Sequence, residues 1–141
     1  MAASTFLDTN VFVYQLDGAD ARKQAIADAL VRRALLTQDA CISFQVVQEC
    51  LNVFTTKARV PLTPAQAQSY LDAVLAPLVQ VGVSADLYRR ALGVRARWQL
   101  SFYDGLIVAA ALTVGCQRLV TEDLQHGQQI ESLTIENPFL V

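Results

Sequence analysis

Short apolar runs alternate along the chain with longer segments in which apolar residues recur every three or four positions. The short runs suit buried strands, and the three-to-four spacing is typical of amphipathic helices. Strands are expected near 5–7, 40–43, 78–83 and 118–121, with 134–136 as a candidate fifth. Helices are expected at about 9–16, 20–36, 45–57, 85–98 and 103–114, and another begins at 64.

Capping residues support these boundaries. Thr63 precedes Pro64, which suits the first turn of a helix, and Gly115 is a natural helix stop. Strands that alternate with helices predict an α/β fold around a parallel sheet, in which ligands bind at the carboxyl ends of the strands. In the helix at 20–36, the period places five apolar residues on the inner face: Ala25, Ile26, Ala29, Leu30 and Ala34.

The composition provides enough apolar residues for a full hydrophobic core. The 141 residues fit one domain, 1–141, and the apolar fraction of 53% exceeds the usual value of about 45–50%. We therefore expect a full core and some apolar surface that meets a partner. No apolar run approaches the roughly 20 residues that cross a bilayer, so no membrane association is expected. The first residues do not resemble a signal peptide.

The three cysteines stand apart in apolar stretches, at Cys41, Cys50 and Cys116. Their odd number and the lack of a leader favour a reducing, cytoplasmic setting. We expect them to be small buried hydrophobic residues.

Two aspartates follow predicted strands. Asp8 ends the first strand and Asp123 lies just past the fourth, so both should reach the carboxyl edge of the sheet. Asp104 lies near the start of an apolar helix, on the same face as Val108 and Ala111.

Glu49 also lies on the inner side of a predicted helix, with Val46 and Val53 three and four positions away. Several carboxylates gathered in one place repel each other, and burying even one is costly without a partner. A hard divalent cation removes both difficulties, and Mg²⁺ prefers such oxygen ligands. The chain has one histidine and no Cys-x-x-Cys pair, which argues against zinc. Taken singly, each acid could also be a helix cap, a loop residue or a solvent-facing residue.

Taken alone, the net charge of −2 argues against a nucleic-acid partner, because phosphate binding requires a basic surface. Removing the four acids named above changes −2 to +2, so the rest of the chain is mildly basic. A metal ion would offset the acids locally.

Four segments carry the acids. Phe6–Val13 contains Asp-Thr-Asn after a strand, Glu49 follows in a helix, and Ser101–Ala111 and Leu119–Gly127 contain Asp104 and Asp123. In this order these segments resemble the four motifs of PIN domains, and more narrowly those of the VapC toxins of bacterial toxin–antitoxin pairs. In the fourth motif Glu122 and Asp123 are adjacent, and the family pattern points to Asp123.

The resemblance implies a three-layer α/β/α fold with a mostly parallel sheet of four to five strands. It implies endonucleolytic cleavage of RNA with Mg²⁺ or Mn²⁺, a homodimer, and an antitoxin that covers the active site. Asp8, Asp104 and Asp123 would then hold the metal directly or through water. Glu49 would hold a water or orient the nucleophile. Further candidates for supporting or substrate-binding roles are Thr9, Asn10, Ser101, Thr121, Arg90 and Arg97.

Several candidates have plainer interpretations. Arg90 and Arg97 share one side of a predicted helix and could bind RNA phosphates or antitoxin acids, or simply face solvent. His126 is interpreted as a loop residue. Trp98 and Tyr103 could stack bases, although the spacing of Trp98 favours the core.

Three other functions stay open at this point. A strand that ends in Asp-x-Asn is also found in phosphatases with an aspartyl nucleophile, although these usually have a second acid where this chain has Asn10. A PIN-like module could be inert and only bind a partner. A nuclease of the same fold could process RNA without being a toxin. Metal binding would exclude the inert module, and an adjacent reading frame for an antitoxin would favour the toxin.

Overall fold

A computed structural model describes residues 3–140 of the chain as a sheet covered by helices. The six strands lie in the order β3-β2-β1-β4-β6-β5. Neighbouring strands are parallel except for the β5–β6 pair, which is antiparallel. The strands are β1 (Thr5–Leu7), β2 (Ala40–Ser43), β3 (Val79–Val81), β4 (Arg118–Val120), β5 (Gln129–Ile130) and β6 (Leu133–Glu136).

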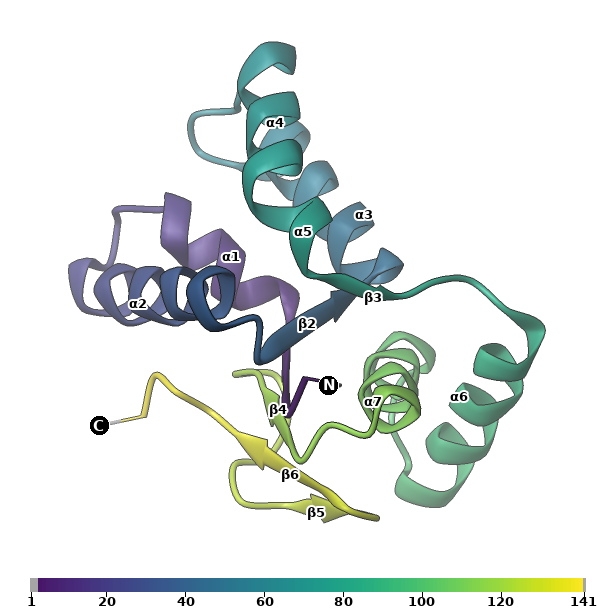
Figure 1. Cartoon of the computed structure of the whole chain (residues 1–141). Coiled ribbons are helices and arrows are strands. Elements are labelled where there is room, and N and C mark those ends of the chain that lie inside the picture. The colour runs from purple at the N-terminus through teal and green to yellow at the C-terminus, as the bar shows by residue number, and fades with distance from the viewer. Residues whose placement is uncertain (1–2, 141) are drawn as a thin grey trace.

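Helices cover both sides of the sheet, which confirms the expected α/β/α arrangement. In Figure 1, α1 and α2 lie on one side and the α6–α7 hairpin lies on the other. The helices are α1 (Thr9–Leu16), α2 (Ala21–Thr37), α3 (Phe44–Asn52), α4 (Pro64–Tyr70), α5 (Ala76–Leu78), α6 (Ala85–Trp98) and α7 (Phe102–Val114). Two π-helical turns, η1 (Val53–Lys57) and η2 (Leu71–Leu75), continue α3 and α4.

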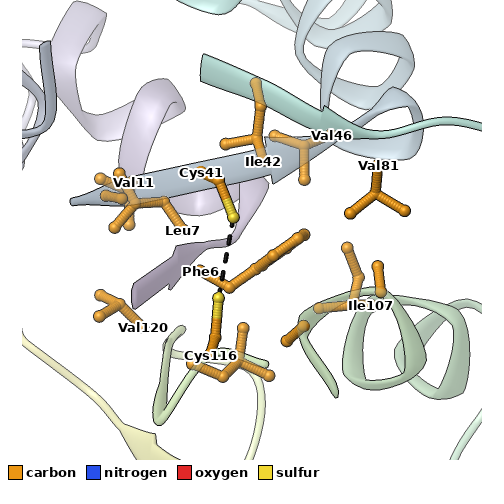
Figure 2. Packing of buried hydrophobic residues seen from close by; sticks show 14 of the residues in the cluster. Phe6, Leu7, Val11, Cys41, Ile42, Val46, Val81, Ile107, Cys116 and Val120 are labelled. Atoms are coloured by element: carbon orange, nitrogen blue, oxygen red, sulfur yellow. Dashed lines mark hydrogen bonds between the residues drawn. The ribbon is translucent and has the colours of Figure 1, made fainter. Parts of the chain in front are cut away.

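The central strands form the core. Every residue of β1 and β2 is buried, as expected for strands that helices cover on both faces. Figure 2 shows Cys41 and Cys116 pointing toward one another beside Phe6, with their sulfur atoms 3.7 Å apart. All three cysteines are free and buried, so they are small hydrophobic residues as expected.

The predicted capping residues are confirmed. Thr63 forms a capping box with Gln66 at the start of α4, and Ser84 accepts a hydrogen bond from the Leu87 N–H of α6. Gly115 ends α7 with a φ of 87°, a conformation that glycine adopts without strain.

Two features differ from the expectation. The sheet has six strands rather than four or five, because β5 forms a hairpin with β6. Its two-residue turn is Glu131-Ser132, and Glu131 has a φ of 54°, so the turn lacks the glycine or asparagine that usually marks it. In α2, Ala25 and Ala29 are exposed. The buried side of α2 carries Ala27, Val31 and Ala34 instead.

None of the helices within 3–140 combines the length and the apolar character needed to span a membrane.

Candidate functional site

Asp8 lies where β1 ends and α1 begins, with only 6% of its surface exposed. One carboxylate oxygen, Oδ1, accepts a hydrogen bond of 2.7 Å from the Thr9 N–H. The other, Oδ2, accepts one of 2.8 Å from the Thr121 hydroxyl. The carboxylate therefore caps α1 and is tied to the end of β4 at the carboxyl edge of the sheet.

Asp123 is joined to Asp8 through two polar side chains. The Thr121 hydroxyl accepts hydrogen bonds from the Asp123 N–H at 3.0 Å and from Asn10 Nδ2 at 3.2 Å. Asn10 Nδ2 also lies 3.2 Å from Asp123 Oδ2, to which it donates. Thr121 is fully buried, so its hydroxyl is a fixed link between the ends of β1 and β4.

Glu49 reaches the same edge from α3. Its Oε2 accepts a hydrogen bond of 3.0 Å from the Thr9 hydroxyl. Its Oε1 accepts one of 2.8 Å from Gln45 Nε2, which also donates to the backbone oxygen of Tyr103 at 3.2 Å. Gln45 therefore ties α3 to the first turn of α7. It was not singled out in the sequence, although its position four residues before Glu49 places both on one face of the helix.

Asp104 occupies the first turn of α7 and is half-buried. Its N–H donates to the Ser101 hydroxyl at 3.1 Å, so Ser101 caps the helix that carries Asp104. Within residues 3–140, no hydrogen-bond donor reaches the Asp104 carboxylate. Its charge acts on Asp123, whose pKa it helps to raise.

Burial is the main cause of the raised pKa values of Asp8 and Asp123. Burial raises the pKa of Asp8 from 3.8 to about 7, although the hydrogen bonds from Thr121 and Thr9 lower it. The negative charges of Asp123 and Glu49 raise it further. The pKa of Asp123 is also raised, mainly by burial. No ion pair of the described chain includes Asp8, Glu49, Asp104 or Asp123.

The oxygen atoms at this edge suit a hard cation. Three buried polar atoms in residues 3–140 lack a hydrogen-bond partner, and they belong to Asn10, Ser43 and Gln45 at the ends of β1 and β2 and the start of α3. Two of these, Asn10 Oδ1 and Gln45 Oε1, are acceptors beside the carboxylates, so this edge has more acceptors than donors. No three Asp, Glu, His or Cys side chains in the described part of the chain are arranged to hold one ion by themselves. A Mg²⁺ ion would therefore keep several waters, as it usually does.

Glu122 lies apart from the four acids. Its carboxylate pairs with Lys23 Nζ at 3.1 Å and accepts a hydrogen bond of 2.6 Å from the Tyr14 hydroxyl. It therefore has partners of its own, whereas the adjacent Asp123 bonds to Asn10. His126 lies in a loop, where its Nδ1 accepts a hydrogen bond from the Asn137 N–H.

The guanidinium groups of the two arginines of α6 have different neighbours. Arg90 is 3.8 Å from Glu131 and 3.5 Å from the Thr113 hydroxyl near the end of α7. Thr113 follows Asp104 by nine residues, or about 13 Å of helix, so Arg90 is not brought to the acids. Arg97 occupies the last turn of α6, with its guanidinium 5.2 Å from the centre of the Trp98 ring.

A model of the PIN domain family matches residues 5–128. The chain belongs to the PIN domain family. The match covers all four acids, and the resemblance of the four motifs is confirmed at the level of the family.

Solved structures share this PIN fold over most of the chain. A toxin–antitoxin complex from Klebsiella pneumoniae is 18% identical with a TM-score of 0.66, over 98% of this chain and all of that one. VapBC2 from Rickettsia felis, bound to a promoter DNA fragment, is 23% identical with a TM-score of 0.62, over 94% and 97%. Mycobacterium tuberculosis VapC20, described as a toxin that cleaves the sarcin–ricin loop, is 23% identical with a TM-score of 0.60, over 82% and 87%. A comparison with curated protein sequences gives no significant match.

Proposed function

We propose that this PIN domain is a Mg²⁺-dependent endoribonuclease and the toxin of a VapBC-type pair. One observation carries the proposal. Asp8 is buried, has a raised pKa and has no cation beside it in the described chain. Hydrogen bonds through Thr9, Thr121 and Asn10 join it to Glu49 and Asp123. A purely structural role would not explain why these three carboxylates are linked at one edge of the sheet with no cation of the described chain paired to any of them.

Each residue has a distinct part in the proposed reaction. When bound, Mg²⁺ or Mn²⁺ supplies Lewis-acid activation of water and neutralises charge on the scissile phosphate. Asp8, Asp104 and Asp123 would hold the ion, directly or through water. Glu49 would orient the attacking water, and the Thr9 hydroxyl fixes the position of the Glu49 carboxylate.

Thr121 and Asn10 would act through the acids rather than on RNA. Thr121 donates to Asp8, and Asn10 donates to Asp123, so both hold a carboxylate in place. Partners of this kind orient the groups that bind a metal directly. Ser101 acts one step further away, because it caps the helix that begins beside Asp104.

The proposed partner is an antitoxin, and the structural relatives described as toxin–antitoxin complexes support this. An apolar hollow of about 210 Å³ between the end of α1 and η1 also suits a protein segment. Leu16, Leu62 and Val60 line it, and Val60 is 80% exposed. Lys57 at the same hollow would suit an acidic residue of the partner, whereas Arg59 lies 3.8 Å from Asp17.

A homodimer is also part of the proposal. Val83 and Leu92, 62% and 56% exposed, leave apolar surface outside that hollow. Co-expression with a short adjacent reading frame would test the antitoxin, and the mass of the purified chain in solution would test the dimer.

The activity is tested by cleavage of a structured RNA with Mg²⁺ by the wild-type chain and two variants. Asp104→Asn removes one proposed metal ligand and should abolish cleavage while circular dichroism shows an intact fold. Glu122→Gln is the matched control, because this acid is half-buried nearby but pairs with Lys23. It should cut at close to the wild-type rate. Normal cleavage by Asp104→Asn would show that the site is wrong.

A further inference from the structure

A groove of about 420 Å³ lies beside Glu49, between α3 and the first turn of α7. Its lining consists of Gln45, Gln48, Glu49, Asn52 and Tyr103. Glu49 is thus shared between the groove and the acidic site. A strand of RNA whose phosphate lay at the acids would bring a neighbouring nucleotide to this groove.

Tyr103 provides a flat apolar surface at the groove. Tyr103 is 66% exposed, so its ring is accessible to a ligand in the groove. The ring packs edge-on against Phe102, with the ring centres 5.5 Å apart and an angle of 75° between the planes. Its backbone oxygen accepts the hydrogen bond from Gln45, so the residue is held on both sides. A ring that is exposed but fixed is suited to stacking.

Gln45 provides a buried acceptor that lacks a donor. Only 2% of its surface is exposed. Its Nε2 faces two acceptors, Glu49 Oε1 and the Tyr103 backbone oxygen, and this fixes which end of the amide is nitrogen. The other end, Oε1, is buried without a partner within residues 3–140. Because Oε1 has almost no accessible surface, Gln45 contributes to the groove by holding Glu49 and the Tyr103 backbone in place.

The charge of the groove excludes a phosphate as its ligand. None of the five lining residues is basic, and Glu49 is an acid. Gln48 and Asn52 lie four residues apart on α3, so their amides project from one face of the helix. Amides beside an aromatic ring recognise a neutral, planar group with donors and acceptors on its edge. Proteins that bind single-stranded RNA read nucleobases in this way.

We propose that the groove binds one nucleobase of the RNA substrate, next to the phosphate that is cut. Tyr103 stacks on the base. The exposed amides of Gln48 and Asn52 contact the edge of the base and contribute to its choice. The proposal rests on the proposed function for its substrate, and it adds a determinant of sequence preference to the same site.

The test measures binding without cleavage. All proteins carry Asp104→Asn, and the affinity for a fluorescent single-stranded RNA is compared with that for the same strand with one abasic position at each place in turn. Base stacking is worth about 1–3 kcal/mol, which corresponds to about 5- to 150-fold in affinity. Tyr103→Ala should weaken binding within this range and remove the penalty of the abasic position. Tyr103→Phe keeps the ring and should retain both.

Tyr88 offers a matched control, because it is 37% exposed on α6 and does not line the groove. Tyr88→Ala should bind like the parent protein. The proposal is overturned if Tyr103→Ala binds the complete and abasic strands as the parent does. A separate cleavage assay of the wild-type chain keeps the two proposals apart. If wild type leaves RNA uncut but Tyr103→Ala still loses base-dependent binding, the base site stands and the nuclease proposal fails.

Discussion

Asp8 is buried at the end of β1, where two donors contact its carboxylate and its pKa is raised to about 7. The folded chain therefore holds this proton more tightly than the unfolded chain, whose carboxyl has a pKa near 3.8. Between pH 3.8 and about 7 the folded state binds more protons, so the free energy of unfolding falls as the pH rises through that window. Asp8 thus costs stability at neutral pH unless a cation is bound.

This leads to a prediction for the metal-free protein. In EDTA, urea unfolding should give a free energy that falls between pH 5 and pH 8, with Asp8 contributing at most about 3 kcal/mol in this window. Asp8→Asn should flatten the profile, because the carboxamide does not titrate. Mg²⁺ should recover part of the lost stability of wild type at pH 8. An equally steep profile in Asp8→Asn would assign the titration to another group.

At the residue scale, strand ends and motifs in the sequence predict that Asp8 and Asp123 lie at one edge of the sheet. The end of the strand alone does not distinguish Asp123 from Glu122, because their side chains differ only in direction, and it is the family pattern that points to Asp123. The structure separates them through Lys23, 99 positions away in sequence from Glu122. Gln45 was not predicted as a site residue, because one of its partners is the backbone oxygen of Tyr103, which lies in another helix far along the chain.

Among the elements, the α6–α7 hairpin positions Asp104, and its packing depends on a glycine. A methyl group added at Gly105 would lie 3.1 Å from the Ala91 backbone oxygen and 3.3 Å from Arg95 Cβ. Gly93, in α6, has open space around the same position. The two helices therefore approach closely just after Asp104. Of these two glycines, only Gly105 lies where a side chain would crowd the facing helix.

The two glycines give a paired prediction. Gly93→Ala should raise the free energy of unfolding by about 0.5–1 kcal/mol, because alanine favours the helix. Gly105→Ala gains the same helix propensity but crowds α6, and overpacking costs about 1–3 kcal/mol. We expect Gly105→Ala to be less stable than Gly93→Ala by at least about 1 kcal/mol in urea unfolding. Equal stabilisation by both would mean that the close contact relaxes freely.

Elements with strong periodicity or caps were predictable, and those without either were not. The long apolar run of α7 predicted that helix, and Gly115 predicted where it ends. The two-residue strand β5 has no period to detect, and its turn has no glycine. Alanines on both faces of α2 concealed which side is buried, so Ala25 was placed wrongly.

The whole molecule carries a net charge of −2, yet the acids of the candidate site are collected at one edge of the sheet. Arg97 lies in the last turn of α6, shortly before Ser101, which caps the helix that carries Asp104. The guanidinium of Arg90 instead lies near Glu131 and near Thr113, toward the end of α7. We therefore expect Arg97, and not Arg90, to contact an RNA strand bound at the acids.

This difference can be measured through salt dependence. A phosphate contact contributes about one unit to the slope of the logarithm of RNA affinity against the logarithm of salt concentration. Arg97→Ala should reduce the slope by about 1, and Arg90→Ala should leave it unchanged. An effect of Arg90→Ala equal to that of Arg97→Ala would place RNA along the whole hairpin.

The central claim is that four carboxylates act together through a divalent cation to cut RNA. Its most direct test is the single-turnover cleavage rate of one RNA by the wild-type chain as Mg²⁺ is titrated into metal-free protein. We predict no cleavage in EDTA, a rate that rises to saturation with Mg²⁺, and no cleavage by Asp8→Asn at any concentration. Cleavage in EDTA at the saturated rate, or none at any Mg²⁺ or Mn²⁺ concentration, would contradict the account.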